Sequence, residues 1–311
     1  MRLGRAAGVT DTGRRRLRNE DAFICEPPLF AVADGMGGAR AGEVAAGIAA
    51  AALEEVRSET RGPEGIVALI AEANRRIWER SLTDPETAGM GAVVTAALFD
   101  AVGETVAIGH VGDSRAYLFR DGAIEQLTTD HSLVAELVQS GVLTPEEAER
   151  HPQRSAITRA LGTEPTVDVD AFTVKAEPGD VFLLCSDGLS IMVADEGVAA
   201  AIEAADRDPA RSAEALVAAA NARGGEDNVT VVLFETIEGE EAEDEPLERG
   251  ESSEPEPEPD SMGTHASEEP EKPSGSLNRH GAGPGGRLAA LLLIVALLGV
   301  ATLALYWGVT R

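Results

Sequence analysis

Short apolar runs, several of them close neighbours in the sequence, constrain the fold of residues 1–236 most strongly. Each run is four to eight residues long, which is typical of β-strands. Six of them stand out: Phe30–Ala33, Ala92–Phe99, Thr105–Val111, Ala116–Phe119, Val181–Cys185 and Val229–Phe234. Only Gly-Asp-Ser-Arg separates the third run from the fourth. A link this short predicts an antiparallel pair, because a parallel connection needs a crossover of about a dozen residues.

Helical patterns lie between these runs. Residues Glu43–Arg57 and Gly65–Arg80 are rich in alanine and repeat their apolar positions with the period of a helix. Asp208 and Pro209 supply an N-cap and a first-turn proline for a third helix that would end at Ala222. Antiparallel strands mixed with amphipathic helices predict an α+β sandwich with the helices outside the sheets.

A strongly acidic segment follows the strand-rich part. The chain carries a formal net charge of −28, and between Glu235 and Glu271 there are 16 acidic residues against one arginine. Residues 237–287 also contain Glu-Pro repeats, serine and glycine, but few large apolar residues. Such a segment cannot bury enough surface to offset its ordering entropy. We interpret residues 237–287 as a disordered linker, either a passive spacer or a docking tail, and favour the spacer.

An uncharged stretch of 20 residues, Leu288–Trp307, stands before a short tail of residues 308–311. As a helix it would span ~30 Å, the hydrocarbon thickness of a bilayer. A buried core helix is the alternative, but such a helix rarely follows a disordered linker. Arg279 and Arg287 precede the stretch, only Arg311 follows it, and no secretory signal begins the chain. These features predict a single-pass protein of the cell membrane whose residues 1–236 face the cytoplasm.

Charge and cysteine content exclude several classes of protein. A non-specific nucleic-acid binder normally needs a basic face, so we expect no nucleic-acid partner. The two cysteines, Cys25 and Cys185, are too few for a disulfide scaffold or a CxxC zinc site.

Aspartates stand beside four of the apolar runs. Asp34 and Asp187 each end a run and precede a glycine, Asp113 follows a third run, and Asp227 with Asn228 opens a fourth. Carboxylates gathered in one place repel each other unless a cation lies among them. Oxygen ligands without paired histidines or cysteines favour Mg²⁺ or Mn²⁺. A single Asp-Gly is usually only a turn, so this metal-site hypothesis depends on the four aspartates together.

Seven motifs in order along residues 9–236 resemble the metal-dependent protein serine/threonine phosphatases, the PPM or type 2C family, especially its bacterial members. The motifs are Arg16-Leu-Arg-Asn-Glu-Asp21, Ala33-Asp-Gly-Met-Gly-Gly38, Gly89-Met-Gly91, Gly109-His-Val-Gly-Asp-Ser-Arg115, Thr158-Arg-Ala-Leu-Gly162, Ser186-Asp-Gly-Leu189 and Glu226-Asp-Asn-Val229. The resemblance implies two packed antiparallel β-sheets flanked by helices, an αββα sandwich, for a phosphatase domain at residues 1–236. A transmembrane helix at 288–307 would lie outside it.

The resemblance also implies the ligands of a dinuclear metal centre. Asp34 would bridge two central ions, and the carbonyl of Gly35 would complete the coordination of one of them. Asp187 and Asp227 would ligate the other. The cofactors implied are two Mn²⁺ or Mg²⁺ ions in the central site.

The remaining matched residues would support these ligands. Glu20 and Asp21 would orient metal-bound waters, and Asp113 would help to bind a third, weaker metal ion. Arg16 would bind the substrate phosphate, because a guanidinium offers a planar pair of donors. Asn228 would hold the neighbouring ligand loop.

The activity implied is hydrolysis of phosphoserine and phosphothreonine in proteins by a metal-activated water. The expected partners are phosphorylated proteins, including serine/threonine kinases whose action the enzyme would reverse, and the lipid bilayer through the C-terminal helix. Met36 occupies a position where some relatives have a histidine proposed as a general acid, so that role is excluded here.

Residues Asp130–Leu161 resemble the flap of the bacterial members. A helix is expected near Ser132–Gln139, and Thr144-Pro-Glu-Glu147 has the spacing of a capping box. We expect this segment to border the cleft and to influence which phosphoprotein is accepted. The two nearby histidines, His110 and His131, are interpreted as structural.

Two other hypotheses remain open. A non-catalytic relative would keep the fold and bind phosphoproteins, but it would be expected to lose a metal aspartate or the arginine, and all are present. A membrane-anchored scaffold would act through its acidic linker. Deleting residues Glu235–Glu271 would separate the scaffold from the spacer, because only a scaffold would lose a partner while hydrolysis continued.

Overall fold

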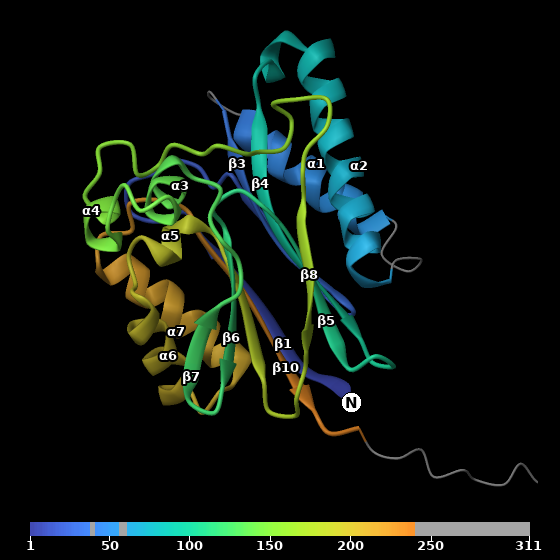
Figure 1. The fold of residues 1–311 in the computed structure, drawn as a ribbon, viewed down its shortest axis with the longest axis vertical. Helices are drawn as coiled ribbons and strands as arrows, with labels where there is room; N and C mark the ends of the chain where they lie inside the picture. Colours follow the sequence, from blue (N-terminus) through green and yellow to red (C-terminus); the bar gives the residue numbers. More distant parts are fainter. Residues whose placement is uncertain (38–40, 56–60, 240–311) are drawn as a thin grey trace, which may run out of the picture. The chain divides into compact units, whose positions relative to one another are not determined.

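The computed structural model describes residues 1–37, 41–55 and 61–239 (Figure 1). Its strands are β1 (Arg2–Asp11), β2 (Asp21–Glu26), β3 (Leu29–Met36), β4 (Gly91–Asp100), β5 (Thr105–Val111), β6 (Arg115–Arg120), β7 (Ala123–Gln126), β8 (Asp170–Lys175), β9 (Val181–Cys185) and β10 (Val229–Ile237). Its helices are α1 (Ala41–Glu55), α2 (Gly62–Thr83), the short 3-10 helix η2 (Pro85–Thr87), α3 (Leu133–Gln139), α4 (Pro145–Glu149), α5 (Asp187–Ser190), α6 (Asp195–Ala204) and α7 (Pro209–Ala222).

The strands form two five-stranded antiparallel sheets. The first sheet has the order β1-β10-β9-β6-β7 and the second has the order β2-β3-β4-β5-β8. Helices α6 and α7 pack against the first sheet, and α1 and α2 pack against the second (Figure 1). The predicted α+β architecture of two packed antiparallel sheets flanked by helices is therefore confirmed.

Three apolar layers hold this sandwich together, one between each sheet and its helices and one between the two sheets. Between the second sheet and its helices, small side chains such as Ala45 and Ala49 are fully buried, so α1 can approach the sheet closely. Between the two sheets, Phe30 stacks on Phe234 with ring centroids 4.1 Å apart, and Phe182 stacks on the same ring at 5.0 Å. Aromatic rings bury large areas, and these three lie where the sheets face each other.

The expected pairing of Thr105–Val111 with Ala116–Phe119 is wrong. Strand β5 pairs with β4 and β8, whereas β6 pairs with β7 and β9 in the other sheet. Gly112 in the link has φ 115°, a conformation that favours glycine, and a Cβ there would lie 2.1 Å from Cβ of Val93. The link therefore carries the chain across from one sheet to the other, with Asp113 in the crossing.

The helices form close to their predicted positions. Helices α1 and α2 occupy the two alanine-rich segments, although residues 56 and 57 of the first prediction lie outside the described residues. Both hydrogen bonds of the predicted capping box are present between Thr144 and Glu147 at the start of α4. The Asp208 side chain caps α7 by accepting a hydrogen bond of 2.9 Å from the backbone N–H of Arg211.

The C-terminal predictions fall largely outside the described residues. Strand β10 ends at Ile237, one residue past the predicted domain end at residue 236. Beyond residue 239, the linker, the predicted membrane helix at 288–307 and the tail are not described. No helix within residues 1–37, 41–55 and 61–239 combines the length and apolar character needed to cross a bilayer.

Candidate metal centre

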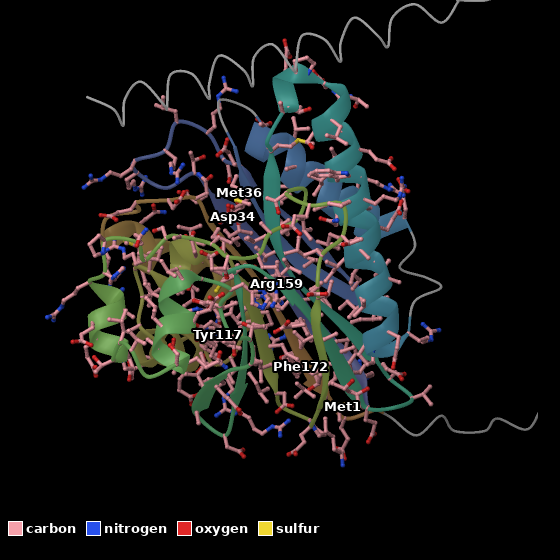
Figure 2. The ribbon with its side chains drawn as sticks, turned by 45° about the horizontal axis from the view of Figure 1, so that its top comes forward. Met1, Asp34, Met36, Tyr117, Arg159 and Phe172 are labelled. Atoms are coloured by element: carbon pink, nitrogen blue, oxygen red, sulfur yellow. The ribbon has the colours of Figure 1, made fainter. Side chains whose placement is uncertain are left out.

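A cavity of about 350 Å³ lies at the end of the sandwich where Asp34 and Met36 are found, far from Met1 (Figure 2). It is lined by Arg16, Glu20, Asp34, Gly35, Met36, Gly37, Val93, Asp113, Arg154, Ser155, Ile157, Asp187, Ile191, Glu226 and Asp227. Every predicted site residue except Asp21 and Asn228 is in this lining. The structure therefore brings together carboxylates that are widely separated in the sequence.

Asp34 lies inside strand β3, two residues before its end, and not at a strand tip as predicted. It stands opposite Asp21 of β2 on one side and Val93 of β4 on the other. The next residue, Gly35, donates its N–H to the carbonyl of Glu20 at 3.1 Å. A Cβ on Gly35 would lie 2.0 Å from the carbonyl oxygen of Gly42, so no other residue fits without a shift.

Asp187 and Asp227 enter the cavity from the first sheet. Asp187 opens the short helix α5 directly after β9 and the intervening Ser186. Asp227 lies two residues before β10, and its Oδ1 accepts a hydrogen bond of 2.8 Å from the N–H of Asn228. Asp113 reaches the same cavity from the link between β5 and β6. The ligands predicted for the metal ions thus come from both sheets.

Asp21 is a buried carboxylate behind the cavity. Its Oδ2 accepts hydrogen bonds from Oγ of Ser186 at 2.8 Å and from Oγ1 of Thr230 at 2.6 Å. Both hydroxyls belong to the first sheet or its edge, whereas Asp21 begins β2 of the second sheet. Asp21 therefore ties the two sheets together beside the cavity, while Glu20 lines the cavity itself.

Burial and neighbouring charges raise the pKa of four aspartates in and behind the cavity, Asp21, Asp34, Asp113 and Asp187. Burial, and then the charges of Asp113, Asp227 and Asp21, raises the pKa of Asp187 to about 8. Burial is also the main reason why the pKa of Asp21 and that of Asp113 rise to about 6. The pKa of Asp34 is raised well above its usual value by burial and by Asp21 and Asp187. Such a cluster cannot be fully ionised at neutral pH unless positive charge is added.

The side chains fit a hard divalent cation. Oδ1 of Asp21 and Oδ1 of Asp187 are buried and have no hydrogen-bond partner among the described residues. No histidine or cysteine occurs in the described lining, so the donors are all oxygen, as Mn²⁺ and Mg²⁺ prefer. Within the described residues, no three such side chains converge on a single point. Water would therefore complete the coordination of an ion held here, as is usual for Mg²⁺.

Arg16 is the cation at the edge of this acidic cavity. Its Nη2 lies 2.6 Å from Oδ2 of Asp227, and half of its side chain is exposed. The hydrogen bond to Asp227 is the main cause that raises its pKa, so the guanidinium stays charged. None of the described residues takes its other donors, so they can meet an anion in the cavity.

Asn228 fixes the segment that carries Arg16. Its Oδ1 accepts a hydrogen bond of 2.8 Å from the N–H of Glu20. Its Nδ2 donates to the carbonyls of Thr12 at 3.0 Å and Arg18 at 2.8 Å. One side chain therefore holds both ends of the β1–β2 link, which carries Arg16.

The predicted flap borders the cavity, but some of its contacts were not foreseen. Arg154, Ser155 and Ile157 line the opening, and Nη2 of Arg154 lies 3.9 Å from Oε2 of Glu226. Helices α3 and α4 precede these residues in the chain. Arg154 lies in the predicted flap and Glu226 in the last matched motif, but neither was assigned to the cavity, because their side chains meet only in the folded chain. Their opposite charges, together with the motif around Glu226, were the signals in the sequence that could have identified them.

The two histidines near the site are buried and do not line the cavity. Nδ1 of His110 lies 2.9 Å from Oγ1 of Thr95, and burial lowers the pKa of His110 to about 4. Nδ1 of His131 accepts the N–H of Gly112 at 3.0 Å. The His131 bond fastens the start of the flap to the β5–β6 link, and the His110 bond joins β5 to β4, which agrees with structural roles for both histidines.

Known proteins are similar to this chain in sequence and in fold. The family model of protein phosphatase 2C matches residues 13–221. The serine/threonine protein phosphatase PstP of Mycobacterium tuberculosis is 40% identical over 252 residues, which are 79% of this chain and 48% of that protein. The chain thus spans about half the length of this relative.

Two further similarities cover nearly all of the compared protein. The serine/threonine phosphatase stp of Listeria monocytogenes is 39% identical over 238 residues, or 73% of this chain and 93% of that one. The crystal structure of the catalytic domain of PstP in complex with two manganese ions matches with a TM-score of 0.70 at 38% identity, covering 76% of this chain and 99% of that domain. The chain therefore belongs to the protein phosphatase 2C family of PPM serine/threonine phosphatases.

Proposed function

We propose that this protein is a metal-dependent phosphatase that hydrolyses phosphoserine and phosphothreonine in proteins. The observation that carries the proposal is the cavity in which Arg16 stands beside a cluster of carboxylates with raised pKa. An anionic substrate would not enter such a cluster unless cations neutralised it. The manganese ions named in the PstP structure make Mn²⁺ or Mg²⁺ the fitting cofactor.

Each residue of the cavity has a part in this proposal. Asp34 and the carbonyl of Gly35, together with Asp187 and Asp227, would hold two divalent ions. Bound ions of this kind would supply an activated water nucleophile and would neutralise charge on the phosphoryl group. Asp113 would take part in binding a third, weaker ion.

The other residues would position water and substrate. Glu20 and Asp21 would orient water molecules, and Oδ1 of Asp21 is a buried acceptor without a partner among the described residues. Arg16 would exchange part of its contact with Asp227 for the phosphate, which a planar guanidinium can bind through two parallel N–H groups. Asn228 would keep Arg16 in place through the β1–β2 link.

Phosphate release tests the proposal. The full chain, purified in a mild detergent, is given a phosphothreonine peptide with Mn²⁺ or with EDTA, beside the variants Asp34→Asn and Asp121→Asn. Asp121 is exposed in the β6–β7 turn with φ 51°, a conformation that asparagine tolerates, so it is a matched control. We expect Mn²⁺-dependent release that Asp34→Asn loses and the control retains. A folded full chain that binds Mn²⁺ but releases no phosphate would instead support a non-catalytic phosphoprotein-binding relative.

We further propose that the enzyme is a single-pass membrane protein that opposes serine/threonine kinases at the cytoplasmic face. The uncharged segment Leu288–Trp307 and the arginines before it support this placement. Replacing Leu293 and Ala296 with arginine should move the protein from the membrane to the soluble fraction. Leu277→Arg, placed in the linker, serves as the control. Equal membrane association of all three chains would contradict the proposal.

A further inference from the structure

The loop between β1 and β2 exposes a run of five side chains beside the cavity. Residues 14–18, here called the arginine loop, read Arg-Arg-Arg-Leu-Arg, and all five are exposed. Leu17 is 99% exposed, although burying a leucine is normally favourable. Within this run, Arg16 alone lines the cavity. The other four residues surround the position of the proposed phosphate-binding arginine.

The backbone of the arginine loop is held at both ends. The N–H groups of Arg14 and Arg15 donate to the carbonyl of Gly225 at 2.7 and 3.2 Å. At the other end, Nδ2 of Asn228 holds the carbonyl of Arg18 at 2.8 Å. A loop fixed in this way presents its side chains without a large ordering cost for the backbone when a partner binds.

Most of the positive charge on the loop is not paired with acidic side chains among the described residues. Arg16 is paired with Asp227, but Arg14, Arg15 and Arg18 make no ion pair with any residue that the structure describes. The cavity behind them is lined by acidic side chains. A phosphopeptide that approached the site would therefore meet an acidic cavity bordered by arginines, which favours negative charge around the phosphorylated residue.

We propose that the arginine loop is a substrate-recognition surface that selects phosphoprotein segments with acidic residues and an apolar residue next to the phosphorylated one. This proposal rests on the proposed phosphatase function. The arginines would pair with the acidic side chains, and Leu17 would pack against the apolar one. Arg16 would bind the phosphate itself, so recognition and chemistry would meet on one short loop. The chemistry of the occupant is thus that of an acidic peptide and not that of a nucleic acid.

The test compares phosphothreonine peptides with the full chain and Mn²⁺. One peptide has acidic and leucine neighbours, a second has acidic and alanine neighbours, and a third has neutral neighbours. The variants are Arg15→Gln/Arg18→Gln and Leu17→Ser. Their controls are Arg2→Gln/Arg211→Gln, which removes the same charge elsewhere, and Val102→Ser, which changes a side chain 95% exposed in the β4–β5 turn.

We expect kcat/KM of the wild type to be about three- to ten-fold higher for the acidic peptide than for the neutral one. The double arginine variant should bring this ratio close to one, whereas its control should keep it. Leu17→Ser should remove the advantage of leucine over alanine, and Val102→Ser should not. The preference should also weaken at high salt, because exposed charges are screened.

Three results would overturn the proposal while leaving the phosphatase function intact, since the neutral peptide would still be hydrolysed. The ratio could persist in the double arginine variant, or it could fall equally in the charge control. It could also be absent in the wild type but emerge when Glu254, Glu256 and Glu258 are changed to glutamine. In that last case the chain's own acidic linker, and not the substrate, would occupy the loop.

Discussion

Replacing Asp187 with asparagine should stabilise the metal-free protein while removing its Mn²⁺-dependent activity. In the folded chain, burial and the neighbouring charges of Asp113, Asp227 and Asp21 raise the pKa of Asp187 to about 8 from its usual value of 3.8. The folded state therefore keeps a proton that the unfolded state gives up at neutral pH. This difference in protonation lowers the free energy of unfolding of the wild-type chain. Because an asparagine does not titrate, Asp187→Asn removes this cost.

The sign and size of the effect follow from linkage between protonation and folding. The free energy of unfolding falls by about 1.4 kcal/mol for each pH unit in which only the folded state holds the proton. The cost is absent below about pH 4, grows as the pH rises and is complete above about pH 8. At pH 7 it amounts to about 4 kcal/mol, which is an upper bound for the gain in Asp187→Asn, because the buried amide must still find partners. A gain of that size would raise Tm by roughly 10 °C in a domain of this length.

Thermal unfolding followed by circular dichroism measures this directly. Wild type, Asp187→Asn and the exposed control Asp121→Asn are melted in EDTA at each pH from 4 to 8, and again with Mn²⁺. We expect the advantage of Asp187→Asn to be near zero at pH 4 and to grow with pH, and Mn²⁺ to stabilise the wild type more than the variant. The reasoning is refuted if the Tm difference between variant and wild type does not change with pH.

Two further substitutions test the proposed phosphate-binding role of Arg16 and the tight packing of Gly35 against the backbone of Gly42. Arg16→Lys keeps the charge but loses the paired donors, so kcat/KM for phosphopeptides should fall at least about tenfold while the Mn²⁺-induced rise in Tm persists; an unchanged kcat/KM would contradict the assigned role. Gly35→Ala should lower the free energy of unfolding in urea by more than about 1 kcal/mol, because its Cβ would lie 2.0 Å from the Gly42 carbonyl oxygen. Gly47→Ala in α1 is its control, because nothing lies within 4 Å of a Cβ at residue 47 and alanine favours the helix. Equal destabilisation of both variants would be evidence against steric crowding at residue 35.

Elements with a strong local pattern were predictable from the sequence. Strands β5 and β9 match their predicted ranges, and the capping box at Thr144 and the cap at Asp208 form as expected. Caps and apolar runs are set by neighbours in the chain, so a single sequence carries their signal. Strand β1 has no such signal, because Gly4, Ala6 and Gly8 interrupt its apolar pattern. It becomes a strand only by pairing with β10, more than two hundred residues away.

The candidate site shows the same division between local and non-local information. The aspartates could be selected because each stands next to an apolar run, and the family motifs could assign them roles. Their spatial relation could not be derived in the same way. The mistaken pairing of β5 with β6 shows why: Gly112 turns the chain into the other sheet, and this turn, not the length of the link, decides where Asp113 lies.

The proposed metal ligands come from both sheets, so the metal centre depends on how the two sheets pack together. Asp34 belongs to the second sheet, whereas Asp187 and Asp227 stand at the edge of the first. Asp21 spans the junction through its hydrogen bonds to Ser186 and Thr230. Separation of the sheets would therefore disperse the carboxylates and break these bonds together. Conversely, an ion held between the sheets would oppose their separation. Its attraction for the carboxylates would outweigh their mutual repulsion, and it would therefore stabilise the fold at the place where the substrate would bind.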